Sequence, residues 1–118
     1  MPYLKTPDGC RLFFEFHTND RINHSPVIVF LNGFTQTTLQ WKYQVDELKD
    51  AYQVLTYDAR SQGNSDSGDF PLTLGQHTQD LAGLLAFLQI KNAHFIGISL
   101  GTKLSLAFAE YYPQKVNS

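Results

Sequence analysis

The stretch AHFIGISLG at residues 93–101 decides the fold. Its first part, residues 93–98, is short and mostly apolar, which fits a strand buried on both faces of a parallel sheet. Its end has the pattern G-x-S-x-G, and residues 100–112 continue it with helical periodicity until Pro113. This strand–turn–helix context is the one in which such a serine serves as a nucleophile. The stretch therefore predicts a buried strand, a sharp turn at Ser99 and a helix.

The residues around Ser99 indicate how this turn would work. Gly97 and Gly101 have no side chains, so the strand and the helix can approach each other closely. The turn would hold Ser99 in an unfavourable backbone conformation, expose its Oγ and place it at the positive end of a helix. The N–H of Leu100 would then donate to a developing oxyanion. The alternative is an ordinary turn, because Gly and Ser are common in turns of every kind.

Two more buried strands and two more helices are predicted upstream. The runs 27–31 and 54–57 are short, continuous and apolar, as strands of a parallel sheet are. One helix is expected from residue 37 or 38, and another after Thr73, whose hydroxyl would cap it. The apolar positions of the three helices are Trp41, Val45 and Leu48; Leu81, Leu84, Leu85 and Leu88; and Leu100, Leu104, Ala107, Phe108 and Tyr111.

The order of these elements predicts the class of fold. Residues 3–5 and 11–17 flank Pro7-Asp8-Gly9, a strong turn signal, and predict a β-hairpin ahead of the other elements. The chain then reads β-α-β-α-β-α, which is typical of an α/β fold with a mostly parallel sheet and helices on both faces. Right-handed crossovers bring the turns after the strands to one edge, where ligands bind in such folds.

Composition excludes several classes of protein. The chain has 118 residues, 42% of them apolar, and a formal net charge of −2, which suit one domain and argue against a nucleic-acid partner. The single cysteine, Cys10, excludes an internal disulfide framework and a multi-cysteine zinc site. No apolar run approaches the roughly 18 residues of a membrane span, and no signal peptide is visible. We therefore expect a soluble, cytoplasmic protein that does not bind membranes.

Several stretches, taken in order, resemble the N-terminal half of the α/β-hydrolase superfamily. Residues 27–34 look like the third strand of that family and its oxyanion turn, with Asn32 and Gly33 where His-Gly is usual. Residues 58–65 resemble its D-x-R-G-x-G-x-S loop, with Ser61 at the position of the usual glycine. The resemblance covers nearly the whole chain and implies a partial α/β-hydrolase fold.

The resemblance also implies roles for individual residues. Ser99 matches the nucleophile, and residues 106–113 resemble the end of the helix behind it. The backbone N–H groups of Phe34 and Leu100 would form the oxyanion hole. The residues that shape the two turns would be Asn32, Gly33, Gly97 and Gly101. The implied activity is hydrolysis of an ester or related carbonyl substrate through an acyl-enzyme, without a metal or organic cofactor.

The base and the acid of such a site are missing from the chain. The family's order is nucleophile, acid, histidine, but after Ser99 the only carboxylate side chain is that of Glu110 and there is no histidine. The resemblance therefore implies a single, incomplete domain over residues 1–118 that lacks the C-terminal strands, cap and helices. By itself, this half of a serine hydrolase would be nearly inactive.

The missing half would also leave the strand at residues 93–98 at an edge of the sheet, with unpaired backbone groups. A complementary C-terminal chain could pair with it, or the chain could form a homo-oligomer through that edge. Residues 115–118 stand about where the sixth strand of the family would begin.

Other interpretations of the same residues remain open. A non-catalytic binding or assembly module would keep the fold without the chemistry, whereas a nucleotide-binding domain is disfavoured by the absence of G-x-G-x-x-G and P-loop patterns. A local base is the less expected role for each histidine, and Lys103 is expected to be solvated. The histidines are His17, His24, His77 and His94, and the aromatic residues that could line a pocket are Phe34, Trp41 and Phe70.

Overall fold

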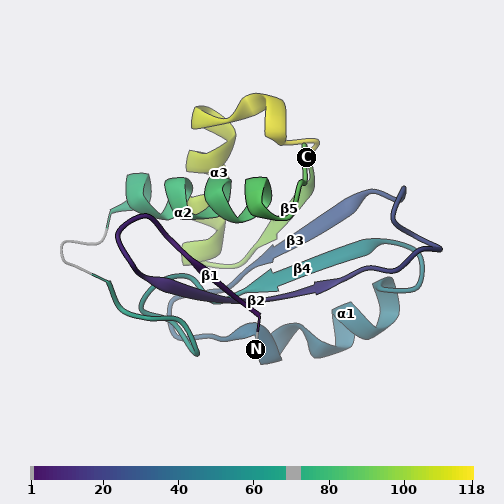
Figure 1. Cartoon of the computed structure of the whole chain (residues 1–118), viewed down its shortest axis with the longest axis horizontal. Coiled ribbons are helices and arrows are strands. Elements are labelled where there is room, and N and C mark those ends of the chain that lie inside the picture. Colours follow the sequence, from purple (N-terminus) through teal and green to yellow (C-terminus); the bar gives the residue numbers. More distant parts are fainter. Residues whose placement is uncertain (1, 69–72) are drawn as a thin grey trace.

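A five-stranded mixed sheet forms the centre of the computed structural model, which describes residues 2–68 and 73–118 (Figure 1). The strand order is β1-β2-β4-β3-β5. Strand β2 pairs antiparallel with β1 and β4, whereas β3 pairs parallel with β4 and β5. The hairpin and the three strands are confirmed, and β3 and β4 are buried as predicted. The third strand, β5, was expected to be buried on both faces but is only partly buried, because it lies at the edge of the sheet and Ile96 on it is exposed. Their bounds are β1 Tyr3–Lys5, β2 Arg11–His17, β3 Val27–Leu31, β4 Gln53–Tyr57 and β5 His94–Gly97.

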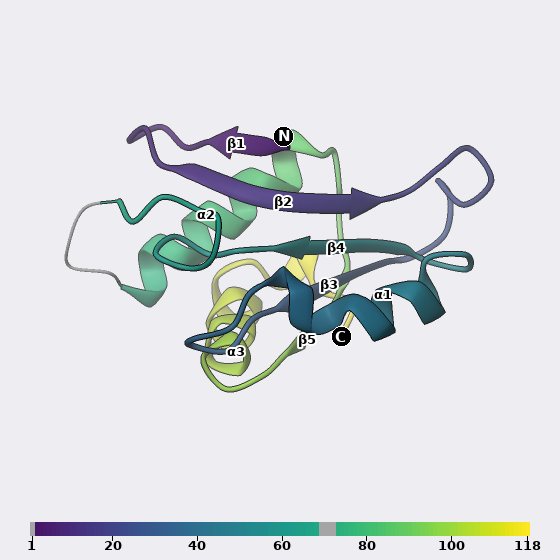
Figure 2. The same ribbon diagram turned by 90° about the horizontal axis from the view of Figure 1, so that it is seen from below.

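Helices cover both faces of the sheet, as expected. Helix α1 lies on one face, and α2 and α3 pack side by side on the other (Figures 1 and 2). The first helix begins as a 3₁₀ turn, η1, and the third is followed by another, η2. Thr73 caps α2 as predicted, because its hydroxyl accepts the N–H of Gln76. The bounds are η1 Thr38–Trp41, α1 Lys42–Leu48, α2 Leu74–Phe87, α3 Leu100–Tyr111 and η2 Pro113–Lys115.

The larger part of the hydrophobic core lies between the sheet and the pair α2–α3. The leucine face of α2 was predicted correctly, with three of its leucines fully buried and Leu88 packed partly against them. Each such side chain contributes about 1.5–3 kcal/mol when fully buried. The opposite face holds a smaller cluster, in which Trp41 packs on Phe30 with ring centroids 4.6 Å apart.

The outer face of α3 differs from its prediction. Tyr111 was expected on the apolar face but is exposed, and Tyr112, one residue later, stacks on the buried ring of Phe108 instead. The helix ends at Tyr111, and the backbone leaves helical geometry at Tyr112. The Tyr112 side chain is therefore the one that packs against the core. Lys103 is exposed, which confirms that it is solvated.

Residues 115–118 lie along the outer side of β5, where the sixth strand was expected. The N–H of Ala93 donates to Lys115 O at 3.0 Å, and the N–H of Phe95 donates to Ser118 O at 2.8 Å. Ala93 and Val116 form a parallel bridge. The expected free edge is thus paired at the start of β5. Further along it, Ile96 and Ile98 remain 45% and 44% exposed.

Candidate active site

The turn at Ser99 has the strained geometry that the sequence predicts. Ser99 has φ 55° and ψ −115°, a sparsely populated conformation for an L-residue that costs about 1–3 kcal/mol. It is exposed between the end of β5 and the first residue of α3. The two glycines permit the turn, because a Cβ on Gly97 would overlap the backbone of Gly101 and one on Gly101 would overlap Leu31 O. At these two positions the backbone segments therefore approach each other directly, with no side chain between them.

The turn after β3 lies directly beside the Ser99 turn. The N–H of Ile98 donates to Leu31 O at 3.3 Å, and a Cβ placed on Gly33 would lie 3.4 Å from Ile98 O. In the part of the chain that the structure describes, the N–H groups of Phe34 and Leu100 have no intramolecular acceptor. Each of the two neighbouring turns thus has one backbone N–H group without an acceptor in the described chain, and the role of these groups in an oxyanion hole stays a prediction. The Phe34 side chain is 75% exposed.

Asn32 occupies the position where the family usually has histidine, and its amide is buried and fully bonded. Its Nδ2 donates to Asp58 Oδ1 at 3.0 Å and to Tyr57 O at 3.1 Å, while its Oδ1 accepts from Trp41 Nε1 at 2.9 Å. These bonds join the ends of β3 and β4 to η1. Trp41 is therefore a core residue and not part of an open pocket, and Phe70 lies outside the described residues.

Two glutamines that the sequence analysis did not single out hold the Gly33 turn. Gln36 Oε1 accepts the N–H of Gly33 at 2.8 Å, and Gln62 Nε2 donates to Gly33 O at 2.9 Å. The spacing of Gln36 three residues after Gly33 was the available local signal. Gln62 comes from the loop after β4, so no local pattern could reveal it. The Gln62 bond is to the peptide that carries the Phe34 N–H, and the Gln36 bond is to the peptide before it.

The loop after β4 contains one departure from the family pattern, which is Ser61 in place of the usual glycine. Ser61 has φ 71°, the left-handed conformation that glycine adopts without strain, which accounts for the usual glycine there. Asp58 organises the loop: its carboxylate accepts from the N–H groups of Thr38 and Asn64, each at 3.0 Å, as well as from Asn32.

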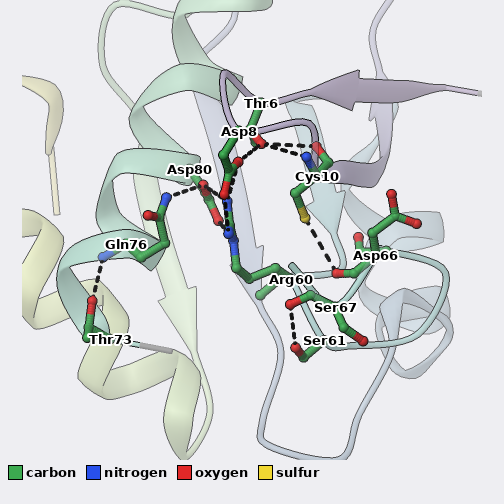
Figure 3. Close-up of polar contacts among 12 residues, drawn as sticks. Thr6, Asp8, Cys10, Arg60, Ser61, Asp66, Ser67, Thr73, Gln76 and Asp80 are labelled. Carbon is green, nitrogen blue, oxygen red and sulfur yellow. Dashed lines mark hydrogen bonds and ion pairs between the residues drawn. The ribbon is translucent and has the colours of Figure 1, made fainter. Parts of the chain in front are cut away.

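A buried ion cluster fastens the same loop to the rest of the molecule (Figure 3). The Arg60 side chain is only 1% exposed and donates twice to Asp80 on α2 and twice to Asp8 in the hairpin turn, at 2.7–3.1 Å. The Arg60 guanidinium holds the pKa of the Asp8 carboxyl well below its usual range. Thr6 also donates to Asp8, and Gln76 donates to Asp80.

The histidines take up the places that their sequence positions suggested. His94 begins β5, at the end away from Ser99, and His17 ends β2. His24 is exposed in the following loop, and His77 is buried in the first turn of α2. Among the described residues, the Ser99 hydroxyl has no hydrogen-bond partner, and no group of three or more potential metal ligands occurs. Within the same ranges, no helix has the length and apolar character needed to cross a membrane.

The fold and the serine turn together define the class, which is a partial α/β-hydrolase fold. The profile described as "alpha/beta hydrolase fold" matches residues 26–118. The chain belongs to this family.

The relatives include lactonases and esterases. The 3-oxoadipate enol-lactonase 1 of Acinetobacter baylyi is 39% identical over 88 residues, which are 75% of this chain and 33% of the enzyme. The crystal structure of an enol-lactonase from Burkholderia xenovorans superimposes with a TM-score of 0.90 at 30% identity, covering 98% of this chain and 44% of that one. A crystal structure from a study of carboxylesterases of Nitrososphaera gargenis superimposes with a TM-score of 0.90 at 28% identity, covering 99% of this chain and 43% of that one. The chain thus spans about a third of the length of the curated enol-lactonases that it matches.

Proposed function

We propose that this chain is the nucleophile-bearing part of a serine hydrolase that cleaves small esters or lactones. The observation that carries the proposal is the backbone of Ser99, a non-glycine residue held at φ 55° and exposed between β5 and α3. Strain of this kind persists only where the surrounding structure imposes it, and it gathers at functional sites. The enol-lactonases among the relatives supply the substrate class.

In the proposed reaction, Ser99 Oγ attacks the substrate carbonyl and its proton passes to a base. The oxygen that gains negative charge accepts hydrogen bonds from the N–H groups of Phe34 and Leu100. Collapse of this intermediate expels the alcohol, which takes up the proton, and leaves an acyl-serine that water then hydrolyses. Gln36 and Gln62 support the first donor by holding the Gly33 turn.

The base and the acid come from outside residues 1–118, which we propose form a single, incomplete domain. Their source is a complementary C-terminal segment or chain, or a second copy that joins at the β5 edge. Apolar surface on β5 and α3 supports such a partner: Ile96 and Ile98 face away from the main core, and Leu106 and Tyr111 are 68% and 62% exposed. We expect the chain alone to be nearly inactive.

The test is a chimaera in which residues 26–118 replace the matching segment of A. baylyi enol-lactonase 1. Hydrolysis of its enol-lactone and of an activated ester should be measurable, and Ser99→Ala should abolish it, by a factor of at least about 10³. Ser67→Ala is the matched control, because Ser67 is exposed in a loop and its hydroxyl makes no hydrogen bond within the described chain.

A folded chimaera that lacks activity would instead support the alternative, a non-catalytic binding or assembly module. Enzyme-like turnover by the pure 118-residue chain, lost in Ser99→Ala, would contradict the proposal that the base lies elsewhere.

A further inference from the structure

A small, partly open cavity lies behind the Ser99 turn, between the end of β4 and the helices α2 and α3. Its volume is about 10 Å³. Tyr57, His77 and Gln62 contribute polar side chains to its wall, and Leu100 and Leu104 contribute apolar ones. The proposed reaction uses neither Tyr57 nor His77.

Two of the residues that line this cavity each have a buried polar atom without a partner in the described chain. Tyr57 Oη and His77 Nδ1 are both buried and make no hydrogen bond to residues 2–68 or 73–118. Tyr57 is 2% exposed and His77 is 7% exposed. Leaving one buried polar group unsatisfied costs about 1–3 kcal/mol, so two such groups on one cavity require an explanation.

The size of the cavity decides what can satisfy them. An internal cavity needs roughly 10–15 Å³ to hold one water molecule, whereas any organic ligand needs several times that volume. A water also needs two or more polar partners, and this wall offers a hydroxyl and a ring nitrogen. From these observations we infer that the cavity binds a single structural water molecule, bridging Tyr57 Oη and His77 Nδ1.

The charges around His77 agree with a neutral imidazole at this site. Burial lowers the pKa of His77, and the positive Arg60 acts in the same direction, while the negative Asp80 opposes both. Tyr57, on β4, lines the same cavity, and its hydroxyl stays protonated because burial raises its pKa. A neutral ring leaves one nitrogen free to accept, and a water molecule can donate to it while accepting from Tyr57.

The water has a structural consequence for the neighbouring turns. Leu100, whose N–H is the proposed oxyanion donor, and Asn32, which joins β3 to β4, both belong to the same cavity wall. The bridge would thus tie β4 and α2 together directly behind the two turns of the site.

The test is a crystal structure of the unmodified chain at a resolution that shows ordered water. We expect one density peak within hydrogen-bonding distance of both Tyr57 Oη and His77 Nδ1. In solution, the same water should give cross-relaxation to the ring protons of both residues, a measurement that needs no substitution. A dry cavity in the crystal, or a direct bond between the two side chains, would overturn the inference.

Two variants separate the bridge from general hydration. Tyr57→Phe removes one partner and keeps the ring, so the peak and the cross-relaxation to His77 should be lost or strongly reduced. Tyr52→Phe is the matched control, because Tyr52 is partly exposed just before β4 and should leave both signals unchanged. Equal signals in the two variants would contradict a bridging role.

Discussion

The loop after β4 and the turn after β5 both follow the carboxyl ends of parallel strands, on the same side of the molecule, but different kinds of contact hold them in place. Side chains from distant segments hold the loop, above all the carboxylates that surround Arg60. The turn depends on missing side chains, since Gly97 and Gly101 let the backbones touch. The first arrangement is vulnerable to an uncompensated charge and the second to one added methyl group.

The largest effect is expected when the loop loses its cation. Arg60→Met would leave the Asp80 carboxylate, 3% exposed, without its partner, and breaking a buried pair in this way costs about 3–5 kcal/mol. Urea unfolding measures the loss. The double variant Arg60→Met with Asp80→Leu should recover much of it, because no buried charge then remains.

Arg11→Met is the control for this experiment. Arg11 pairs with Asp66 on the surface, and exposed pairs contribute about 1 kcal/mol or less. If Arg60→Met costs no more than Arg11→Met, side chains do not hold the loop and the contrast between the two regions fails.

A smaller loss is expected when the turn gains one methyl group. Gly101→Ala would drive a Cβ into the carbonyl oxygen of Leu31, and overpacking of this kind costs about 1–3 kcal/mol. Gly83→Ala is the matched control, because a Cβ there meets nothing within 4 Å and alanine favours the helix by about 0.5–1 kcal/mol. Thermal unfolding should therefore shift in opposite directions, and equal shifts would contradict the steric explanation.

The smallest effect is expected for His77, which lies behind the two regions, and concerns how the stability of the chain depends on pH. Burial lowers the pKa of His77 in the folded chain, so in acid the unfolded chain binds the proton first. The stability that neutral His77 contributes to the folded chain is fully present above the ordinary histidine pKa of about 6.5. It is lost as the pH falls below that value. His77→Leu should flatten the stability curve between about pH 8 and pH 5, with the exposed His24→Leu as the control. An unchanged slope in His77→Leu would exclude this residue as the cause.

Sequence patterns predicted those parts of the molecule that neighbouring residues determine. The Asp8-Gly9 turn, the Thr73 cap and the strained serine each depend on a few consecutive residues, and each stands where it was expected. The catalytic roles of Ser99 and of the N–H groups of Phe34 and Leu100 stay predictions.

Contacts between distant residues could not be predicted. Arg60 is separated from Asp8 by 52 positions in the sequence and from Asp80 by 20. Nothing in the local sequence indicates that a charged residue in a polar loop is buried. Gln62 reaches Gly33 across 29 positions, which only the fold brings together. Local periodicity also misplaced Tyr111, because the helix ends one residue before the tyrosine that packs.

The Arg60 cluster has a consequence for how the molecule opens. Strand β1 is three residues long and has only β2 beside it, and short terminal elements of this kind usually open locally. Here Asp8, at the tip of the hairpin, shares the guanidinium with Asp80 on α2. Lifting the tip would strip a buried cation of one of its two carboxylates. We therefore expect the hairpin tip and α2 to open together, although none of the backbone hydrogen bonds in the described ranges joins them.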